Sequence, residues 1–71
     1  MKYTRGQKVN LHGPMTLQGP EGQLTMEAED SVPGRIVIAY PNGTYDVQTA
    51  QPLVGINYFP AVREDRLSPA Q

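Results

Sequence analysis

Apolar and polar residues alternate along several short segments of this chain, and a period of two residues predicts strands. In residues 7–12, Val9 and Leu11 fall on one face and the polar residues on the other. In residues 24–29, apolar positions alternate with threonine and glutamate. We therefore predict a half-buried first strand, a long excursion through residues 13–31, and within it a second strand with an acidic outer face.

The strongest local signal is a hairpin centred on Asn42-Gly43. Residues 35–40 and 44–49 are rich in β-forming residues, and Asn-Gly tolerates the positive φ angles of a tight turn. Residues 36–39 have no polar position, which predicts a central strand covered on both sides. On the partner strand the expected core residues are Tyr45 and Val47, and the expected outward residues are Thr44, Asp46 and Gln48.

Glycine and proline divide the rest of the chain into short pieces, and no segment favours a helix of ordinary length. We predict a corner at residues 32–34 and a strand over 53–59, with Gly55 marking a bulge or a close backbone approach. A single 3₁₀ turn over 61–65, opened by Pro60, precedes a last short strand over 66–68. The expected units are a flexible N-terminus (1–5), one folded domain (6–68) and a tail (69–71).

This order of elements resembles the SH3-like barrels, including the Tudor and KOW families. The resemblance covers residues 6–68 and implies an all-β, five-stranded SH3-like barrel with a long first loop or hairpin and a 3₁₀ turn before the last strand. Because it consists largely of glycine and core positions, it indicates a fold rather than an activity. The residues that carry it are Gly6-x-x-Val9, Gly34-x-Ile36-Val37, Gly43-x-Tyr45-x-Val47 and Glu64-Asp65-Arg66-Leu67.

The second half of the chain is also similar, in order and spacing, to the plasmid-borne type II dihydrofolate reductases. That resemblance implies a homotetramer around a central pore, NADPH as cofactor, and an origin on a mobile gene cassette. The residues that carry it are Gly34, Ile36, Val37, Tyr40, Val47, Ala50, Pro60 and Arg66-Leu67.

The pore segment of those reductases is Val-Gln-Ile-Tyr-Pro, which aligns with residues 56–60. The alignment implies that Asn57 and Tyr58 lie near the symmetry axis. This chain departs from the pattern, because Asn57 is one methylene shorter than glutamine and Phe59 lacks the tyrosine hydroxyl. The family's lysine-bearing stretch after the first strand also has no counterpart, since residues 15–31 are longer and acidic.

Composition limits the possible partners. The chain has 71 residues and no cysteine, so neither disulfides nor thiolate metal sites can stabilise its small core. Oligomerisation is the remaining way to add stability. A net charge of −1 supplies no field that attracts nucleic acid. The sequence shows no secretory signal and no membrane span, so we expect a cytoplasmic protein.

Candidate chemical groups are sparse. His12 is the only histidine and has no acidic or cysteine cluster beside it, so we expect a solvated side chain and no metal site. Glu27, Glu29 and Asp30 lack the ligand spacing of a calcium loop and fit a solvated face. The cations Lys2, Arg5 and Lys8 are expected to form a thin, frayed N-terminal arm.

Aromatic residues are concentrated in the second half, and the expected binding residues are Tyr40, Asn57, Tyr58 and Phe59. Alternation makes either Tyr58 or Phe59 a core residue, and Asp46 is the acid available to an aromatic cage for a methylated cation. Core packing or a subunit contact accounts for these rings more simply.

We therefore predict a non-enzymatic binding or assembly module without catalytic residues, metal or cofactor. Its partner is itself or another protein, and its contact surface is formed by Tyr40, Tyr58, Phe59 and the excursion. The alternative is a homotetrameric pore-type small-molecule binder or reductase that uses NADPH.

Overall fold

The computed structural model describes residues 2–70 and is all-β, as predicted. Met1 and Gln71, which belong to the predicted terminal segments, lie outside the described residues. No helix within residues 2–70 has the length and apolar character needed to cross a membrane. The elements are β1 (Lys8–His12), β2 (Met15–Gly19), β3 (Gly22–Met26), β4 (Ser31–Ala39), β5 (Thr44–Leu53), β6 (Ile56–Arg63), the 3₁₀ helix η1 (Glu64–Arg66) and β7 (Leu67–Pro69).

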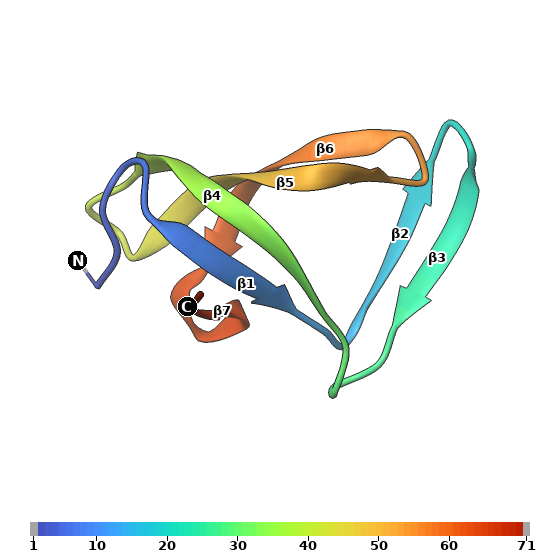
Figure 1. Cartoon of the computed structure of the whole chain (residues 1–71), viewed down its shortest axis with the longest axis horizontal. Coiled ribbons are helices and arrows are strands. Elements are labelled where there is room, and N and C mark those ends of the chain that lie inside the picture. The colour runs from blue at the N-terminus through green and yellow to red at the C-terminus, as the bar shows by residue number, and fades with distance from the viewer. Residues whose placement is uncertain (1, 71) are drawn as a thin grey trace.

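The strands form two antiparallel sheets (Figure 1). The larger has five strands in the order β6-β5-β4-β1-β7, and β2 and β3 form a separate two-stranded sheet. This small hairpin stands at one end of the molecule, and its tip reaches the turn between β5 and β6. There the Glu21 amide donates to the Val54 carbonyl over 3.2 Å.

The core lies against one face of the large sheet, and we call the opposite face the outer face. The Tyr3 and Tyr45 rings meet edge to face, with centroids 5.5 Å apart. The Tyr3 hydroxyl donates to the Leu67 carbonyl over 3.1 Å, while the Tyr3 amide donates to the Tyr45 hydroxyl over 3.2 Å. Tyr3 is thus a core residue, although it precedes the predicted domain boundary. The buried core residues are Tyr3, Val9, Leu11, Ile36, Tyr45, Val47 and Leu67.

The predicted central hairpin is confirmed as β4 and β5. Its connection is stabilised by the Asn42 side chain, whose Oδ1 accepts hydrogen bonds from the Thr44 amide and hydroxyl. Gly43 has a φ of 86°, so the glycine supplies the left-handed conformation that the turn requires. The Tyr40 amide also donates to the Thr44 carbonyl over 2.9 Å, which closes the connection.

Two predictions about β4 are wrong. The expected corner at 32–34 is part of the strand, where Val32, Pro33 and Gly34 pair with β1. Proline explains this, since it biases the preceding residue toward extended backbone. The strand is also not covered on both sides, because Ile38 is 41% exposed.

The excursion contains a complete hairpin of β2 and β3, one of the two alternatives predicted for it, although only its return strand was predicted as a strand. That strand ends at Met26, three residues earlier than expected, because residues 27–30 form a turn. In this turn the Asp30 carboxylate accepts the Glu27 amide over 2.8 Å, and the Asp30 amide donates to the Glu27 carbonyl over 3.1 Å. The expected acidic strand face is therefore an acidic turn.

The region after β5 also differs in its boundaries. Gly55, with a φ of 84°, lies in the turn between β5 and β6 and not in a bulge, and the atoms that approach it belong to the side chains of Pro20 and Glu21 rather than to a neighbouring backbone. A Cβ on Gly55 would lie 2.7 Å from Pro20 Cγ. The 3₁₀ turn begins at Glu64 instead of 61, because β6 continues to pair with β5 as far as Arg63. The last strand is confirmed as β7.

Candidate functional site

A row of four exposed side chains crosses the outer face of the large sheet. Lys8 on β1 pairs with Arg35 on β4, and Arg35 pairs with Gln48 on β5. Gln48 in turn pairs with Tyr58 on β6. Because paired residues of antiparallel strands project from the same face, the register places two cations, an amide and a phenol side by side.

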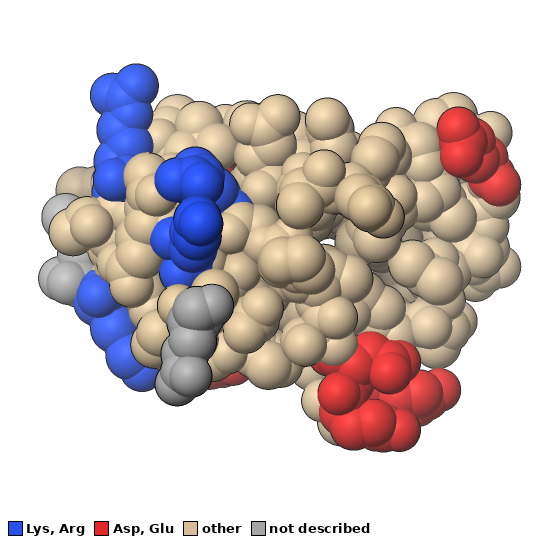
Figure 2. Space-filling view, in the orientation of Figure 1, with Lys and Arg blue, Asp and Glu red and all other residues tan. Residues whose placement is uncertain are grey.

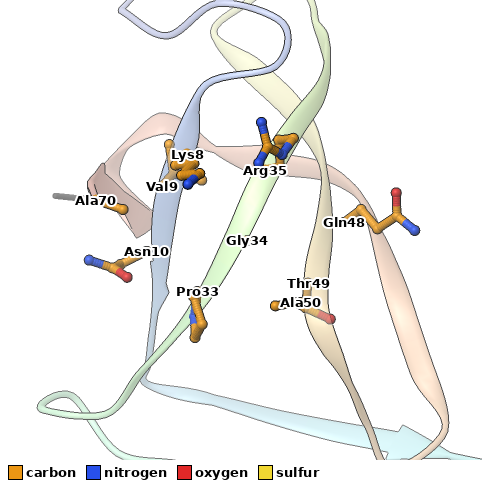
Figure 3. A pocket seen from close by; sticks show the side chains of 10 residues that line it. All are labelled: Lys8, Val9, Asn10, Pro33, Gly34, Arg35, Gln48, Thr49, Ala50 and Ala70. Carbon is orange, nitrogen blue, oxygen red and sulfur yellow. The ribbon is translucent and has the colours of Figure 1, made fainter.

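Most of this row borders an open groove of about 560 Å³. Figure 3 shows Lys8 and Arg35 on adjacent strands at one end of it, with Asn10 and Pro33 farther along the same strands. The side chains of Val9 and Thr49 are buried, so these residues contribute backbone to the groove floor. We call this hollow the basic groove, and its lining residues are Lys8, Val9, Asn10, Pro33, Gly34, Arg35, Gln48, Thr49, Ala50 and Ala70.

Gly34 sets the floor of the basic groove. A Cβ at this position would lie 3.0 Å from the Gln48 carbonyl oxygen and 3.0 Å from Val47 Cγ1. The glycine therefore allows β4 to pack closely against β5 over the core.

A second hollow continues from the basic groove. It has a volume of about 260 Å³ and shares Pro33 and Ala50 with the larger one. Its other lining residues include Val32, Pro52 and Leu53, so the surface becomes apolar in this direction. The two hollows together form a surface that is cationic at one end and apolar at the other.

The cations of the basic groove have no acidic partner among residues 2–70. The one ion pair found there joins Arg63 to Asp65, and neither of these residues lines the groove. Arg35 Nη1 donates to the Gly6 carbonyl over 2.9 Å, which steadies the guanidinium and leaves its charge uncompensated. The groove therefore presents two positive charges to a ligand, of which the Arg35 guanidinium is held in place.

Asp46 joins Tyr40 and Tyr58 beside this row. It is only 5% exposed although it faces away from the core, between Tyr45 and Val47. Its Oδ2 accepts the Tyr58 hydroxyl over 2.6 Å and the Tyr40 hydroxyl over 3.0 Å. Its Oδ1 accepts the Ala61 amide over 3.1 Å. A buried carboxylate is thus fully satisfied by three donors from the neighbouring segments.

These hydrogen bonds determine the protonation of the trio. The pKa of Asp46 is lowered, mainly by the hydrogen bond from the Tyr58 hydroxyl. Burial acts in the opposite direction, while the hydrogen bonds from the Ala61 amide and the Tyr40 hydroxyl lower this pKa further. The same bond to Asp46, with desolvation, raises the pKa of Tyr58 to about 12. The pKa of Tyr40 is also raised, first by its bond to Asp46. At neutral pH the trio is therefore one carboxylate held by two neutral phenols.

Irregular pairing on both sides of β5 creates the space for Asp46. The register of β4 against β5 shifts at Val37, and the register of β6 against β5 shifts around Pro60 and Ala61. Ala61 has a φ of 55°, and its amide is turned toward Asp46. Bulges re-aim side chains in this way beside functional surfaces.

The four predicted binding residues differ in their exposure and in their contacts. Tyr40 and Tyr58 are brought together by Asp46, and Tyr58 is 40% exposed. Asn57 is exposed on β6. Phe59 is half-buried and packs against the core, so alternation correctly gives one core residue from the pair 58 and 59.

Other predicted candidates lie apart from the basic groove. His12 is half-buried rather than solvated, because its Nε2 contacts the Ser68 hydroxyl at 2.5 Å across the pair β1 and β7. The acidic residues of turn 27–30 are exposed. Within residues 2–70 no three potential metal ligands gather. Lys8, predicted in a frayed arm, belongs to β1 and the groove.

Compared with protein-family models, curated proteins and solved structures, the chain matches none of them. Inferences about function therefore come from the geometry of the outer face.

Proposed function

We propose that this chain is an SH3-like module that binds a protein partner and does not catalyse a reaction. The strand order supports this proposal. The excursion is inserted between β1 and β4, β4 to β6 follow one another across the sheet, and β7 returns beside β1. That order is the one expected of the SH3-like barrels that the sequence resembles, and the binding role is argued from the surface.

The basic groove is the observation that carries the binding role. It is open and runs over three strands, so it has room for a segment of a protein partner. Lys8 and Arg35 supply charge for carboxylates, and Gln48 and Asn10 supply amides for hydrogen bonds. The apolar continuation at Val32 and Leu53 suits aliphatic side chains of the same segment. The ligand is therefore an acidic segment of a protein, with apolar residues beside its carboxylates.

The Tyr40, Asp46 and Tyr58 trio supports binding rather than proton transfer. A phenol with a pKa of about 12 keeps its proton at neutral pH. A carboxylate with a lowered pKa that already accepts three hydrogen bonds is a poor general base. The hydrogen bond to Asp46 instead holds the Tyr58 ring in place, beside Gln48 at the end of the row of exposed side chains.

A peptide titration tests this role. The ¹⁵N-labelled protein is titrated with a short peptide of alternating Glu and Val, and with a matched Gln and Val peptide. We expect amide shifts at Lys8, Gly34 and Gln48 with the acidic peptide, and binding at least about tenfold weaker in Arg35→Ala. Arg63→Ala, an exposed arginine outside the groove, serves as the control. Shifts confined to other surfaces, or none at about 1 mM peptide, contradict the proposal.

The alternative, a homotetrameric reductase or small-molecule binder, is favoured by one observation. Asn57 and Tyr58 are both exposed on β6, which is an edge strand of the large sheet. If copies of the chain associate through this edge, both residues lie near their symmetry axis. Light scattering across a range of concentrations gives the solution mass, and NADPH oxidation with dihydrofolate tests the activity. A flat assay at high protein concentration removes the reductase hypothesis.

A further inference from the structure

We infer that the basic groove takes the acidic turn, residues 27–30, of a second copy of this chain. The inference rests on the proposed function, because it names the occupant of the same groove. Its basis is that the chain carries both complementary surfaces, and neither surface forms an ion pair within residues 2–70.

The groove side presents two adjacent cations. Lys8 and Arg35 are paired across β1 and β4, and both side chains are exposed. Neither forms an ion pair within residues 2–70. The Arg35 guanidinium is steadied by the Gly6 carbonyl, so less side-chain entropy is lost when a carboxylate binds to it.

The acidic turn presents three exposed carboxylates on a defined backbone. Glu27, Glu29 and Asp30 are all exposed, and none forms an ion pair within residues 2–70. Asp30 holds the turn by accepting the Glu27 amide, which leaves the two glutamate side chains projecting from a fixed loop. Figure 2 shows acidic side chains protruding at one corner of the molecule, while lysine and arginine side chains gather at the opposite end.

The acidic turn forms no ion pair with the groove cations of its own chain within residues 2–70. Asp30 directly precedes β4, and Arg35 lies farther along the same extended strand. At about 3.3 Å per residue, the two backbone positions lie about 16 Å apart, and the Arg35 guanidinium is held by the Gly6 carbonyl rather than by the turn. Both sets of charges therefore remain available to a second copy.

Overall charge permits this contact. Seven acidic and six basic residues give a net charge of −1, so two copies repel each other weakly as whole molecules. At close approach the separated charges attract, and the attraction is screened over about 10 Å at 0.1 M salt.

Reciprocal charge reversal tests the inference. One variant carries Lys8→Glu and Arg35→Glu, and the other carries Glu27→Lys and Glu29→Lys. Sedimentation velocity measures association of each variant, of their equimolar mixture, and of a chain that carries all four changes. A control with Arg63→Glu and Glu21→Lys reverses exposed charges outside both surfaces. Circular dichroism confirms that every variant is folded, and Gln in place of each reversed residue provides a milder second set.

We expect wild-type self-association to weaken at least about tenfold between about 20 mM and about 500 mM salt. Each reversal variant should lose association to a similar extent, the mixture and the fourfold variant should recover it, and the control should match wild type. A wild type that stays monomeric at about 1 mM protein in low salt overturns the inference. So does association that survives either reversal.

The two proposals fail separately. If the protein stays monomeric but the groove binds the Glu and Val peptide, only the self-association is wrong. If neither the peptide nor a second copy binds, the proposed function is wrong as well.

Discussion

Tyr40 and Tyr58 donate hydrogen bonds to the same carboxylate oxygen, Oδ2 of Asp46, over 3.0 and 2.6 Å. Tyr40 directly follows β4 and Tyr58 belongs to β6, so one side chain on β5 links both of its neighbours. The second oxygen holds the Ala61 amide at the irregular pairing of β6. The carboxylate thus stabilises the part of the outer face that lies beside the basic groove.

Replacing Asp46 with asparagine should release Tyr58. The charge that raises the pKa of Tyr58 to about 12 is lost, so this pKa should fall toward its ordinary value of 10.0. The asparagine oxygen cannot satisfy all three donors, and we expect the Tm to fall by about 5 °C. Ultraviolet titration of tyrosinate and thermal melts measure both effects. Asp65→Asn, in an exposed ion pair, is the control, and a Tyr58 pKa that stays near 12 in Asp46→Asn contradicts the assignment.

Acid should remove the contribution of Asp46 to stability. The Tyr58 hydrogen bond lowers the pKa of Asp46 below its ordinary value of 3.8, although burial acts in the opposite direction. The folded chain therefore binds this proton less readily than the unfolded chain. The stabilisation is complete above the unfolded pKa near 3.8 and is lost as the pH falls through the lower folded pKa. Melts below about pH 4 should show a steeper fall in Tm for wild type than for Asp46→Asn, and equal slopes would exclude this role.

Much of the core was predictable because its residues follow the period of two. Val9 and Leu11 alternate in one short segment, and Tyr45 and Val47 alternate in another, and all four are buried. The hairpin was predictable from Asn42 and Gly43, because these two residues form its turn through local contacts and backbone conformation.

The features that were missed depend on contacts that alternation does not encode. Asp46 was predicted on the outward face, which is correct, but its burial arises from irregular pairing on two neighbouring strands. Tyr3 has no periodic context, and its long-range contacts with Tyr45 and Leu67 make it a core residue. The pairing of Lys8 with Arg35 on the outer face depends on the register of β1 against β4, and neither strand's sequence determines that register by itself. A charged residue flanked by Tyr45 and Val47 near two further tyrosines was the one signal available for Asp46.

Truncating Tyr3 to alanine should strongly destabilise the domain. The side chain is 1% exposed, packs edge to face on Tyr45, and donates to the Leu67 carbonyl. Large-to-small changes of buried aromatic residues cost about 3–5 kcal/mol, a large part of the stability of a small domain. Urea unfolding measures the loss, and Arg5→Ala, at an exposed position in the same segment, should change little. A Tyr3→Ala protein as stable as the Arg5→Ala control would mean that the N-terminal segment is not part of the core.

A methyl group at Gly34 should loosen the pairing of β4 with β5. The new Cβ of Gly34→Ala would lie 3.0 Å from both the Gln48 carbonyl oxygen and Val47 Cγ1, so β5 or the core must move. Overpacking of this kind costs about 1–3 kcal/mol, which exceeds the gain of about 0.4–1 kcal/mol from the lower entropy of the unfolded chain. Urea unfolding should therefore show a net loss, with amide shifts at Gln48. Gln48→Ala removes only an exposed side chain from the same row and should leave the stability nearly unchanged. An alanine variant at 34 that is more stable than wild type would show that β5 yields freely, and that the floor of the basic groove is not set by this glycine.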